Sequence, residues 1–265
     1  MIDRIAAGEF FLIAGPCVIE SGELCLQVAE TVLELAAKYS LPYVFKSSFT
    51  KANRTDASSP TGPGLEEGLR ILSLVKQRLG TPILTDIHQS GDVPAVAEVA
   101  DIIQIPAFLC RQTELIRAAG RTGRWVNLKK GQFMAPEDMA RAAAKAESNK
   151  VMLTERGACF GYHNLVVDFR SFLIMKESGR PVVFDATHSL QRPSAGDGVS
   201  TGQPEYVIPL ARAATAAGVD GLFVETHPKP KTALSDAGAM LPLAQMDDLL
   251  DQVSRVCRAL YESQK

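Results

Sequence analysis

The stretch FFLIAGPCVIES, residues 10–21, decides between the two α/β folds that suit the rest of the chain. Its first half is a short apolar run of the kind that forms a buried parallel strand. The turn that follows, GPCVIES (15–21), is neither the G-x-G-x-x-G of a dinucleotide-binding fold nor a P-loop. This turn argues against an open, doubly wound sheet, which is the alternative, and favours a closed barrel.

Seven more apolar runs follow, and stretches with helical spacing separate them; Val28, Val32 and Ala36, for example, share one helix face. The predicted strands are Phe10–Ala14, Tyr43–Lys46, Ile83–Thr85, Ile102–Ile105, Trp125–Leu128, Val151–Leu153, Val182–Phe184 and Leu222–Val224. Eight strand-helix repeats in about 250 residues are the count and size of a (β/α)₈ TIM barrel. No linker or low-complexity tract divides the sequence, so we predict one such domain over residues 1–265.

The composition excludes several other classes of protein. The chain is 46% hydrophobic and 22% charged, as in globular proteins, and its net charge of −2 offers no basic field to nucleic acid or a membrane surface. Its longest nearly apolar run, Phe10–Ile19, is about half of the 20 or so residues that a membrane span needs. The start of the chain does not read as a signal peptide, and five scattered cysteines form no disulfide framework. We therefore expect a cytoplasmic protein.

A polar residue stands at or just after the carboxyl end of every predicted strand. In chain order these residues are Cys17, Lys46, Asp86, Gln104, Lys129, Arg156, His188 and Glu225. In a barrel these ends form one rim, and the active site is built there. The opposite strand ends are mostly proline or small residues, so chance solvation is a poor explanation. The pattern predicts an active site on this rim.

Many of the charged residues near the rim are cations. Lys46, Lys51, Arg54, Lys129 and Arg156 stand at or beside strand ends, and Arg111 lies beyond the fourth strand. Such a concentration in a nearly neutral protein favours an anionic ligand, and Lys and Arg are the usual phosphate partners. We expect more than one anionic group; the alternative is a solvated loop with unrelated charges.

A second set of residues has metal-binding chemistry. Cys17, His188, Glu225 and Asp236 come from the first, seventh and eighth strands and the loop after the eighth. The first and eighth strands are neighbours in a closed barrel, so a thiolate, an imidazole and two carboxylates can converge on a divalent transition metal. The spacing carries no local signature. From the chemistry alone, a buried structural Cys17 and a His188 bonded to a backbone carbonyl remain open.

Motifs along almost the whole chain resemble those of the 3-deoxy-D-manno-octulosonate 8-phosphate synthase family. They are YVFKSSFTKANRT (43–55), GPGLEEGL (62–69), TDIH (85–88), IQIPAFLCRQT (103–113), NLKKGQF (127–133), RGACFGYHNLVVD (156–168), FDATHSLQ (184–191) and the pair ETHP and LSDA (225–237). The resemblance implies a homotetrameric TIM-barrel enzyme that condenses phosphoenolpyruvate with D-arabinose 5-phosphate and releases phosphate. Its product would feed lipopolysaccharide biosynthesis.

The resemblance also implies roles for individual residues. Cys in the GPCVIES turn, where the metal-independent class has Asn, implies the metal-dependent class, with Zn²⁺, Fe²⁺, Mn²⁺ or Co²⁺ held by Cys17, His188, Glu225 and Asp236. Phosphoenolpyruvate would be bound by Lys46, Lys51, Gln104, Lys129, Arg156 and the backbone of Ala107. The sugar phosphate would be bound by Asn53, Arg54 and Thr55, with Arg111 contributed by a neighbouring subunit. The implied catalytic residues are Asn53, Asp86 and His188.

Two other functions stay possible at this stage. The synthase that starts the shikimate pathway, which uses erythrose 4-phosphate to make 3-deoxy-D-arabino-heptulosonate 7-phosphate, shares the barrel, the metal and phosphoenolpyruvate. It typically carries a KPRT-type motif where this chain has KANRT (51–55), so Asn53 favours the five-carbon sugar. A non-catalytic barrel that senses a sugar phosphate is the other alternative, and the complete set of strand-end residues argues against it.

Overall fold

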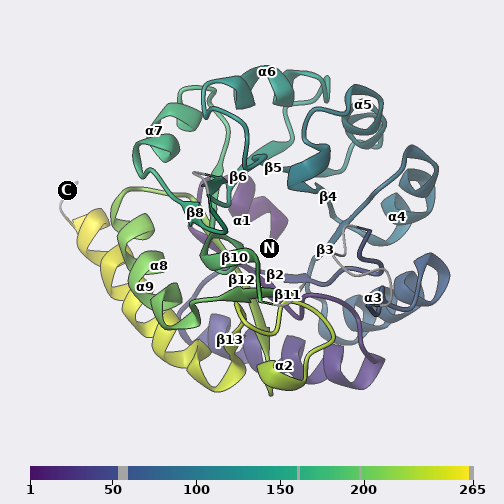
Figure 1. The fold of residues 1–265 in the computed structure, drawn as a ribbon, viewed down its shortest axis with the longest axis horizontal. Coiled ribbons are helices and arrows are strands. Elements are labelled where there is room, and N and C mark those ends of the chain that lie inside the picture. The colour runs from purple at the N-terminus through teal and green to yellow at the C-terminus, as the bar shows by residue number, and fades with distance from the viewer. Residues whose placement is uncertain (53–58, 160–161, 197–198, 263–265) are drawn as a thin grey trace.

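The computed structural model describes residues 1–52, 59–159, 162–196 and 199–262. Eight parallel strands form a closed central ring with helices around it (Figure 1). The strands of the ring are β1 (Phe11–Gly15), β2 (Tyr43–Lys46), β3 (Ile83–Asp86), β4 (Ile102–Ile105), β5 (Trp125–Lys129), β6 (Val151–Glu155), β9 (Val182–Asp185) and β12 (Gly221–His227). The ring closes where β1 pairs with β12, from Phe11↔Gly221 to Gly15↔Glu225. The predicted (β/α)₈ barrel is confirmed, and each predicted strand overlaps an observed one.

A helix follows each strand of the ring. These helices are α2 (Gly22–Lys38), α3 (Leu65–Leu79), α4 (Val93–Val99), α5 (Thr113–Arg121), α6 (Asp138–Ala144), α7 (Arg170–Lys176), α8 (Val207–Ala216) and α9 (Met246–Glu262). In α2, Ser21 Oγ caps the first turn by accepting a hydrogen bond from the Leu24 amide at 3.1 Å, and the apolar face buries Val28 and Val32. None of the helices in the described ranges is long and apolar enough to cross a membrane.

The alternation of side chains along the strands divides the core into two layers. In β1, Leu12 and Ala14 belong to the large cluster between the ring and the helices, whereas Phe11 and Ile13 belong to a smaller cluster inside the ring. Ile5 of α1 (Ile2–Ala6) packs into the inner cluster. Helix α1 therefore covers the amino end of the barrel, and the carboxyl ends of the strands are left for the site.

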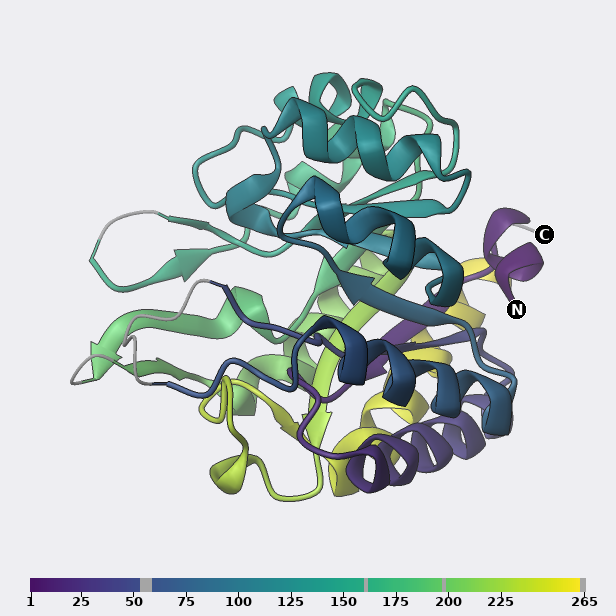
Figure 2. The same cartoon turned by 90° about the vertical axis from the view of Figure 1, so that its right-hand side faces the viewer.

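Two hairpins that the sequence pattern did not predict extend the carboxyl end of the barrel. They are β7 (Ala158–Cys159) with β8 (Leu165–Val166), and β10 (Gln191–Gly196) with β11 (Val199–Gly202). Figure 2 shows both hairpins projecting from one end of the molecule, with α1 at the other end. The short strand β13 (Leu241–Pro242) pairs with the end of β12 outside the ring. The two hairpins enlarge the rim where the polar strand ends meet.

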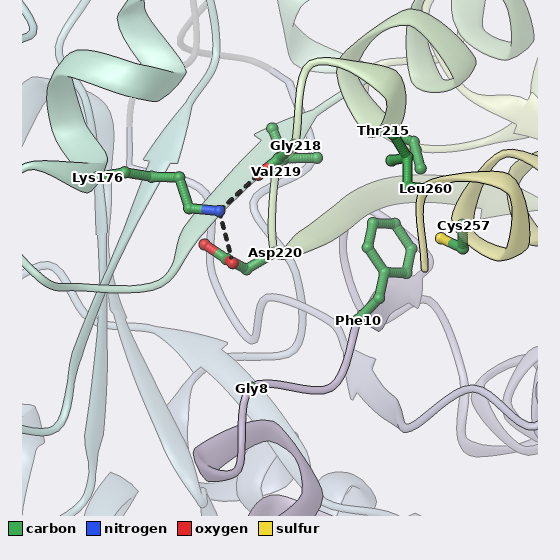
Figure 3. A pocket seen from close by; sticks show the side chains of 9 residues that line it. All are labelled: Gly8, Phe10, Lys176, Thr215, Gly218, Val219, Asp220, Cys257 and Leu260. Atoms are coloured by element: carbon green, nitrogen blue, oxygen red, sulfur yellow. Dashed lines mark hydrogen bonds and ion pairs between the residues drawn. The ribbon is translucent and has the colours of Figure 1, made fainter. Parts of the chain in front are cut away.

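A cavity of about 180 Å³ lies at the opposite end of the barrel, beside the starts of β1 and β12 (Figure 3). Phe10, Val219 and Cys257 line it together with Lys176 and Asp220. Lys176 Nζ is 2.9 Å from an Asp220 carboxylate oxygen and donates to the Gly218 carbonyl at 2.6 Å. Lys176 and Asp220 therefore neutralise each other, and the active site is expected at the rim rather than in this cavity.

Candidate active site

Three of the four predicted metal ligands, Cys17, Glu225 and Asp236, form one cluster at the carboxyl ends of β1 and β12, and His188, after β9, lies next to two of them. Cys17 Sγ is 3.0 Å from Asp236 Oδ2, and each of Cys17, Glu225 and Asp236 offers one donor atom within 4.8 Å of the others. His188 Nε2 lies 3.6 Å from Glu225 Oε2 and 3.8 Å from Asp236 Oδ2. The closed ring thus brings residues 17 and 236 into contact although 219 positions separate them.

The donor set fits a divalent transition metal. Two ligands about 2.0–2.3 Å from a tetrahedral zinc ion lie roughly 3.3–3.8 Å apart. The three pair distances of 3.0, 3.6 and 3.8 Å given above are close to this range, although His188 does not belong to the set of donors that all lie within 4.8 Å of one another. A thiol, an imidazole and two carboxylates are also the mixture of soft and hard ligands that such metals take in proteins. Burial and the neighbouring carboxylates of Asp236 and Glu225 raise the pKa of the Cys17 thiol well above its usual value when no cation is bound.

Lys46 and Lys129 lie next to the aromatic ring of Phe223 in the site. Lys46 Nζ is buried, 2.6 Å from Glu225 Oε1 and 2.9 Å from the Cys17 carbonyl oxygen, to which it donates. Lys129 Nζ stands 3.8 Å from the centre of the Phe223 ring. Burial raises the pKa of Glu225, but the positive charges of His188 and Lys46 outweigh it, and the net shift is downward.

Asp185, at the end of β9, is the buried anchor of the metal-ligand cluster. Its Oδ2 accepts from Lys129 Nζ at 2.6 Å and lies 2.7 Å from His188 Nδ1. Its Oδ1 accepts from the backbone amides of Thr187 and His188, at 3.1 and 2.8 Å. A carboxylate bonded to one imidazole nitrogen orients the other nitrogen toward a metal, and here His188 Nε2 faces the other predicted ligands.

Asp86 forms a second buried cluster on the rim. Its carboxylate accepts a short hydrogen bond from Ser48 Oγ and lies 3.3 Å from His88 Nε2. Burial raises the pKa of Asp86, but Lys51, Lys46 and His88 outweigh it and lower that pKa. Burial lowers the pKa of Lys51, but the charges of Cys17, Glu225, Asp86 and Asp236 outweigh it and raise that pKa. Lys51 is therefore a permanent cation beside the predicted metal ligands.

Arg156 and Gln104 are two of the buried polar residues on the side of β4 to β6. Arg156 is only 6% exposed; its Nη2 donates to Gln191 Oε1 at 2.9 Å, and its Nη1 is buried without a hydrogen-bond partner among the described residues. Gln104 Oε1 accepts from Asn127, which in turn accepts from Thr154. A buried guanidinium nitrogen without a partner is costly, so it marks a place for an anion.

The remaining predicted residues do not join this cluster. Ala107 is buried at the start of a short 3₁₀ turn after β4. Arg111 is exposed, and its carbonyl oxygen accepts a hydrogen bond from Lys145; its action from a neighbouring subunit stays a prediction. Asn53, Arg54 and Thr55 lie outside the described residues.

Several residues of the site were not predicted, among them Asp185, Glu155 and Gln191. Asp185 and Glu155 end strands β9 and β6, and Glu155 Oε1 lies 3.3 Å from the buried Lys130 Nζ. Gln191 begins β10 and bonds both Arg156 and Asp236. An acidic residue directly after an apolar run was a visible signal for both carboxylates. For Gln191 the one signal was its place at the end of the motif FDATHSLQ (184–191); its role could not be read from it, because its partners are 35 and 45 residues away.

The chain matches a known protein family over almost its whole length: the model of the DAHP synthetase I family covers residues 4–261. The chain belongs to this family. Within it, the chain is similar to proteins named 2-dehydro-3-deoxyphosphooctonate aldolase. The protein of Acidithiobacillus ferrooxidans is 54% identical over 91% of this chain and 87% of its own length. Those of Magnetococcus marinus and Desulfotalea psychrophila are 52% identical over 99% and 97% of this chain, and 93% and 94% of their own lengths.

Proposed function

We propose that this protein condenses phosphoenolpyruvate, D-arabinose 5-phosphate and water into 3-deoxy-D-manno-octulosonate 8-phosphate and phosphate. One observation carries this assignment: relatives that share more than half of the aligned residues over nearly the full length bear the name of an aldolase acting on this product. The rim supports it, because a metal-ligand set and buried cations stand side by side. The product would enter lipopolysaccharide biosynthesis in the cytoplasm.

Phosphoenolpyruvate is a small dianion or trianion, and the buried cations suit it. The free Nη1 of Arg156 can donate to a phosphate or carboxylate oxygen while Nη2 keeps Gln191. Lys46, Lys51 and Lys129 supply further positive charge, and Gln104 and the backbone of Ala107 supply polar contacts from β4. Glu225 holds Lys46, Asp185 holds Lys129 and the Gln191 amide holds Arg156, so these three cations are already oriented before the substrate arrives.

Cys17, His188, Glu225 and Asp236 would hold a divalent transition metal. The thiolate and imidazole favour Zn²⁺ or Fe²⁺ over Mg²⁺, and Mn²⁺ or Co²⁺ would also be accepted. When bound, the ion supplies a Lewis acid for the aldehyde oxygen of the sugar or a water of lowered pKa. Asp185 and Lys129 contribute by fixing the His188 ring.

The reaction forms one carbon–carbon bond, between C3 of phosphoenolpyruvate and the aldehyde carbon of the sugar. The oxygen of water adds to C2, and the bond between C2 and the phosphate oxygen breaks, so that phosphate leaves. The buried cations hold the enol and the aldehyde in contact, which is a proximity effect. Asp86, ionised and close to Lys51, is placed to accept a hydrogen bond or a proton near the reacting groups. Asn53 is proposed to act with Asp86 and His188.

The sugar phosphate would be bound by Asn53, Arg54 and Thr55, with Arg111 from a neighbouring subunit of a homotetramer. Exposed aromatic residues support such an interface. Phe108, Phe133 and Tyr162 follow β4, β5 and β6 and are 54%, 58% and 98% exposed. Exposed aromatic side chains on consecutive loops are typical of surfaces that contact another protein chain.

A paired assay tests substrate and metal together. The protein is given phosphoenolpyruvate with arabinose 5-phosphate or erythrose 4-phosphate, each with and without a chelator, and phosphate release and product are measured. We expect product only with the five-carbon sugar, no turnover after chelation, and recovery with Zn²⁺, Fe²⁺, Mn²⁺ or Co²⁺. Preference for erythrose 4-phosphate would assign the heptulosonate synthase instead. No product with either sugar would favour a sugar-phosphate sensor, and full activity in the chelated enzyme would remove the metal from the proposal.

A further inference from the structure

The side chain of Gln191 lies between the metal-ligand cluster and the buried arginine. Gln191 directly follows the 3₁₀ turn of His188–Leu190 and begins β10. Its Oε1 accepts a hydrogen bond from Arg156 Nη2 at 2.9 Å, and its Nε2 donates to Asp236 Oδ1 at 2.8 Å. One amide therefore joins the proposed anion site to one of the proposed metal ligands.

The chemistry of the two partners fixes the orientation of this amide. A guanidinium can only donate hydrogen bonds, and an ionised carboxylate can only accept them. Rotating the amide by 180° would place donor against donor and acceptor against acceptor. Asp236 Oδ1 is therefore committed to Gln191, and Oδ2 is the oxygen that faces Cys17 Sγ at 3.0 Å and His188 Nε2 at 3.8 Å.

The backbone around Asp236 depends on the same hairpin. Asp236 has a φ of 50°, in the left-handed region that a residue with a side chain seldom adopts. Gln191 pairs with Gly202 at the base of the β10–β11 hairpin, and a Cβ added to Gly202 would lie 2.6 Å from the Gly238 carbonyl oxygen. The base of the hairpin thus rests on the segment just after Asp236, and Gln191 supplies a polar contact to its carboxylate.

We propose that Gln191 is a positioning residue that orients the Asp236 carboxylate for metal binding and anchors it to Arg156. This inference rests on the proposed function, in which Asp236 is a metal ligand and Arg156 holds phosphoenolpyruvate. It has an unusual consequence for Arg156. If Arg156 acted only by electrostatic repulsion, removing its positive charge would strengthen the binding of a metal cation nearby. If Arg156 acts through Gln191, removing Arg156 releases the Asp236 carboxylate and weakens metal binding.

The test measures Co²⁺ affinity without substrate, by competition with a chelator and by the charge-transfer absorption of a cobalt-thiolate bond. Wild type, Gln191→Leu, Arg156→Ala and the double variant are compared. Loss of a residue that orients a ligand typically weakens metal binding about 10–100-fold, and we expect this for Gln191→Leu. Arg156→Ala is expected to weaken Co²⁺ binding too. The double variant is expected to bind no more weakly than Gln191→Leu, because residues in one chain of contacts are not additive.

Gln203→Leu is the matched control. Gln203 directly follows Gly202 at the base of the same hairpin, where its backbone amide donates to the Leu190 carbonyl, and its side chain makes no hydrogen bond to the residues that the structure describes. Its Co²⁺ affinity is expected to equal that of the wild type. Circular dichroism checks that each variant folds, and Gln191→Met replaces Gln191→Leu if the latter does not.

Three results would each overturn the inference: wild-type Co²⁺ affinity in Gln191→Leu, tighter Co²⁺ binding in Arg156→Ala, or additive losses in the double variant. These differ from failure of the proposed function. If the wild type makes product but binds no Co²⁺, the metal part of the proposed function is wrong, and if it makes no product, the proposed function is wrong as a whole. If the wild type does both and the variants give any of the three results, only the role of Gln191 is wrong.

Discussion

Replacing Asp185 by Asn is the sharpest perturbation of the site that the structure offers. The Oδ2 atom of Asp185 faces Lys129 Nζ and His188 Nδ1, and Oδ1 faces the backbone amides of Thr187 and His188. Every one of these neighbours donates a hydrogen bond in the observed arrangement. An asparagine side chain has one carbonyl oxygen and one NH₂ group in place of the two carboxylate oxygens. Whichever way it is turned, its NH₂ group faces either the donors at Oδ2 or the donors at Oδ1. Because the Thr187 hydroxyl also donates to Oδ1, the substitution loses at least two hydrogen bonds as well as the negative charge.

The magnitude follows from burial. Asp185 is fully buried, and Lys129 is only 5% exposed. Removing one partner of a buried ion pair costs about 3–5 kcal/mol. Glu225 also acts on Lys129 and moderates the loss, so we expect the lower end, about 3 kcal/mol. For a chain of this size this corresponds to a fall in Tm of roughly 6–12 °C. Because His188 also loses its orienting partner, Co²⁺ affinity should fall about 10–100-fold.

Unfolding is followed by circular dichroism in the presence of a chelator, so that metal binding does not contribute to the measured stability. Co²⁺ affinity is measured separately. Asp220→Asn is the control, since Asp220 also pairs with a lysine but lies at the amino end of the barrel and its side chain is 26% exposed (Figure 3). It should cost about 1 kcal/mol or less and leave Co²⁺ binding unchanged. A variant Asp185→Asn that unfolds like the wild type and binds Co²⁺ normally would show that Asp185 is not the anchor inferred above.

Three further substitutions test other parts of the molecule. Arg156→Ala should raise the KM for phosphoenolpyruvate about tenfold or more, with a smaller effect on the KM for the sugar. Steady-state kinetics with each substrate varied in turn measures both values, and equal increases would contradict the binding of phosphoenolpyruvate by Arg156. Gly120→Ala places a Cβ 1.9 Å from the Ala146 carbonyl oxygen, so thermal unfolding should show a loss of about 1–3 kcal/mol with unchanged KM values. Asp86 has a lowered pKa in the folded protein, so its ionised form stabilises the fold above the unfolded value of about 3.9, and this contribution is lost as the pH falls through the folded pKa. In Asp86→Asn, the free energy of unfolding should therefore depend less on pH below about pH 4; an unchanged pH dependence would contradict the ion cluster around Asp86.

The barrel and its rim could be predicted because both follow from the local periodicity of apolar residues in the sequence. Eight apolar runs of three to five residues alternate with segments that have the periodicity of helices. A closed parallel barrel gives each of the eight runs the same role, that of a strand with two neighbouring strands. Residue position relative to the end of each run then placed Cys17, His188 and Glu225 on one rim. Chain closure through β1 and β12 converted these positions into contacts.

The hydrogen-bond network could not be predicted in the same way. Gln191 and Asp185 act through side chains of distant strand ends, and no spacing rule says which strand-end side chains will touch. The two hairpins were missed because β7 and β8 have only two residues each and β10 and β11 carry little apolar character. Of the predicted cations, Lys46, Lys51, Lys129 and Arg156 lie at the rim, Arg111 is exposed and Arg54 is outside the described residues; their partners were not predicted. Lys46 and Lys129, which suggested unpaired positive charge, are bonded to Glu225 and Asp185.

This pairing changes the reason why the rim would attract an anion. Among the described residues of the site, five cations stand against five carboxylates. The cations are Lys46, Lys51, Lys129, Lys130 and Arg156, and the carboxylates are Asp86, Glu155, Asp185, Glu225 and Asp236. With His188 neutral, as a metal-binding imidazole must be, these side chains are balanced, and Glu225, Asp185 and Glu155 hold Lys46, Lys129 and Lys130 in place. With a divalent ion bound and Cys17 ionised, the same site carries one net positive charge, because the ion adds two and the thiolate removes one. The affinity for phosphoenolpyruvate should therefore depend on the metal as well as on the lysines and the arginine.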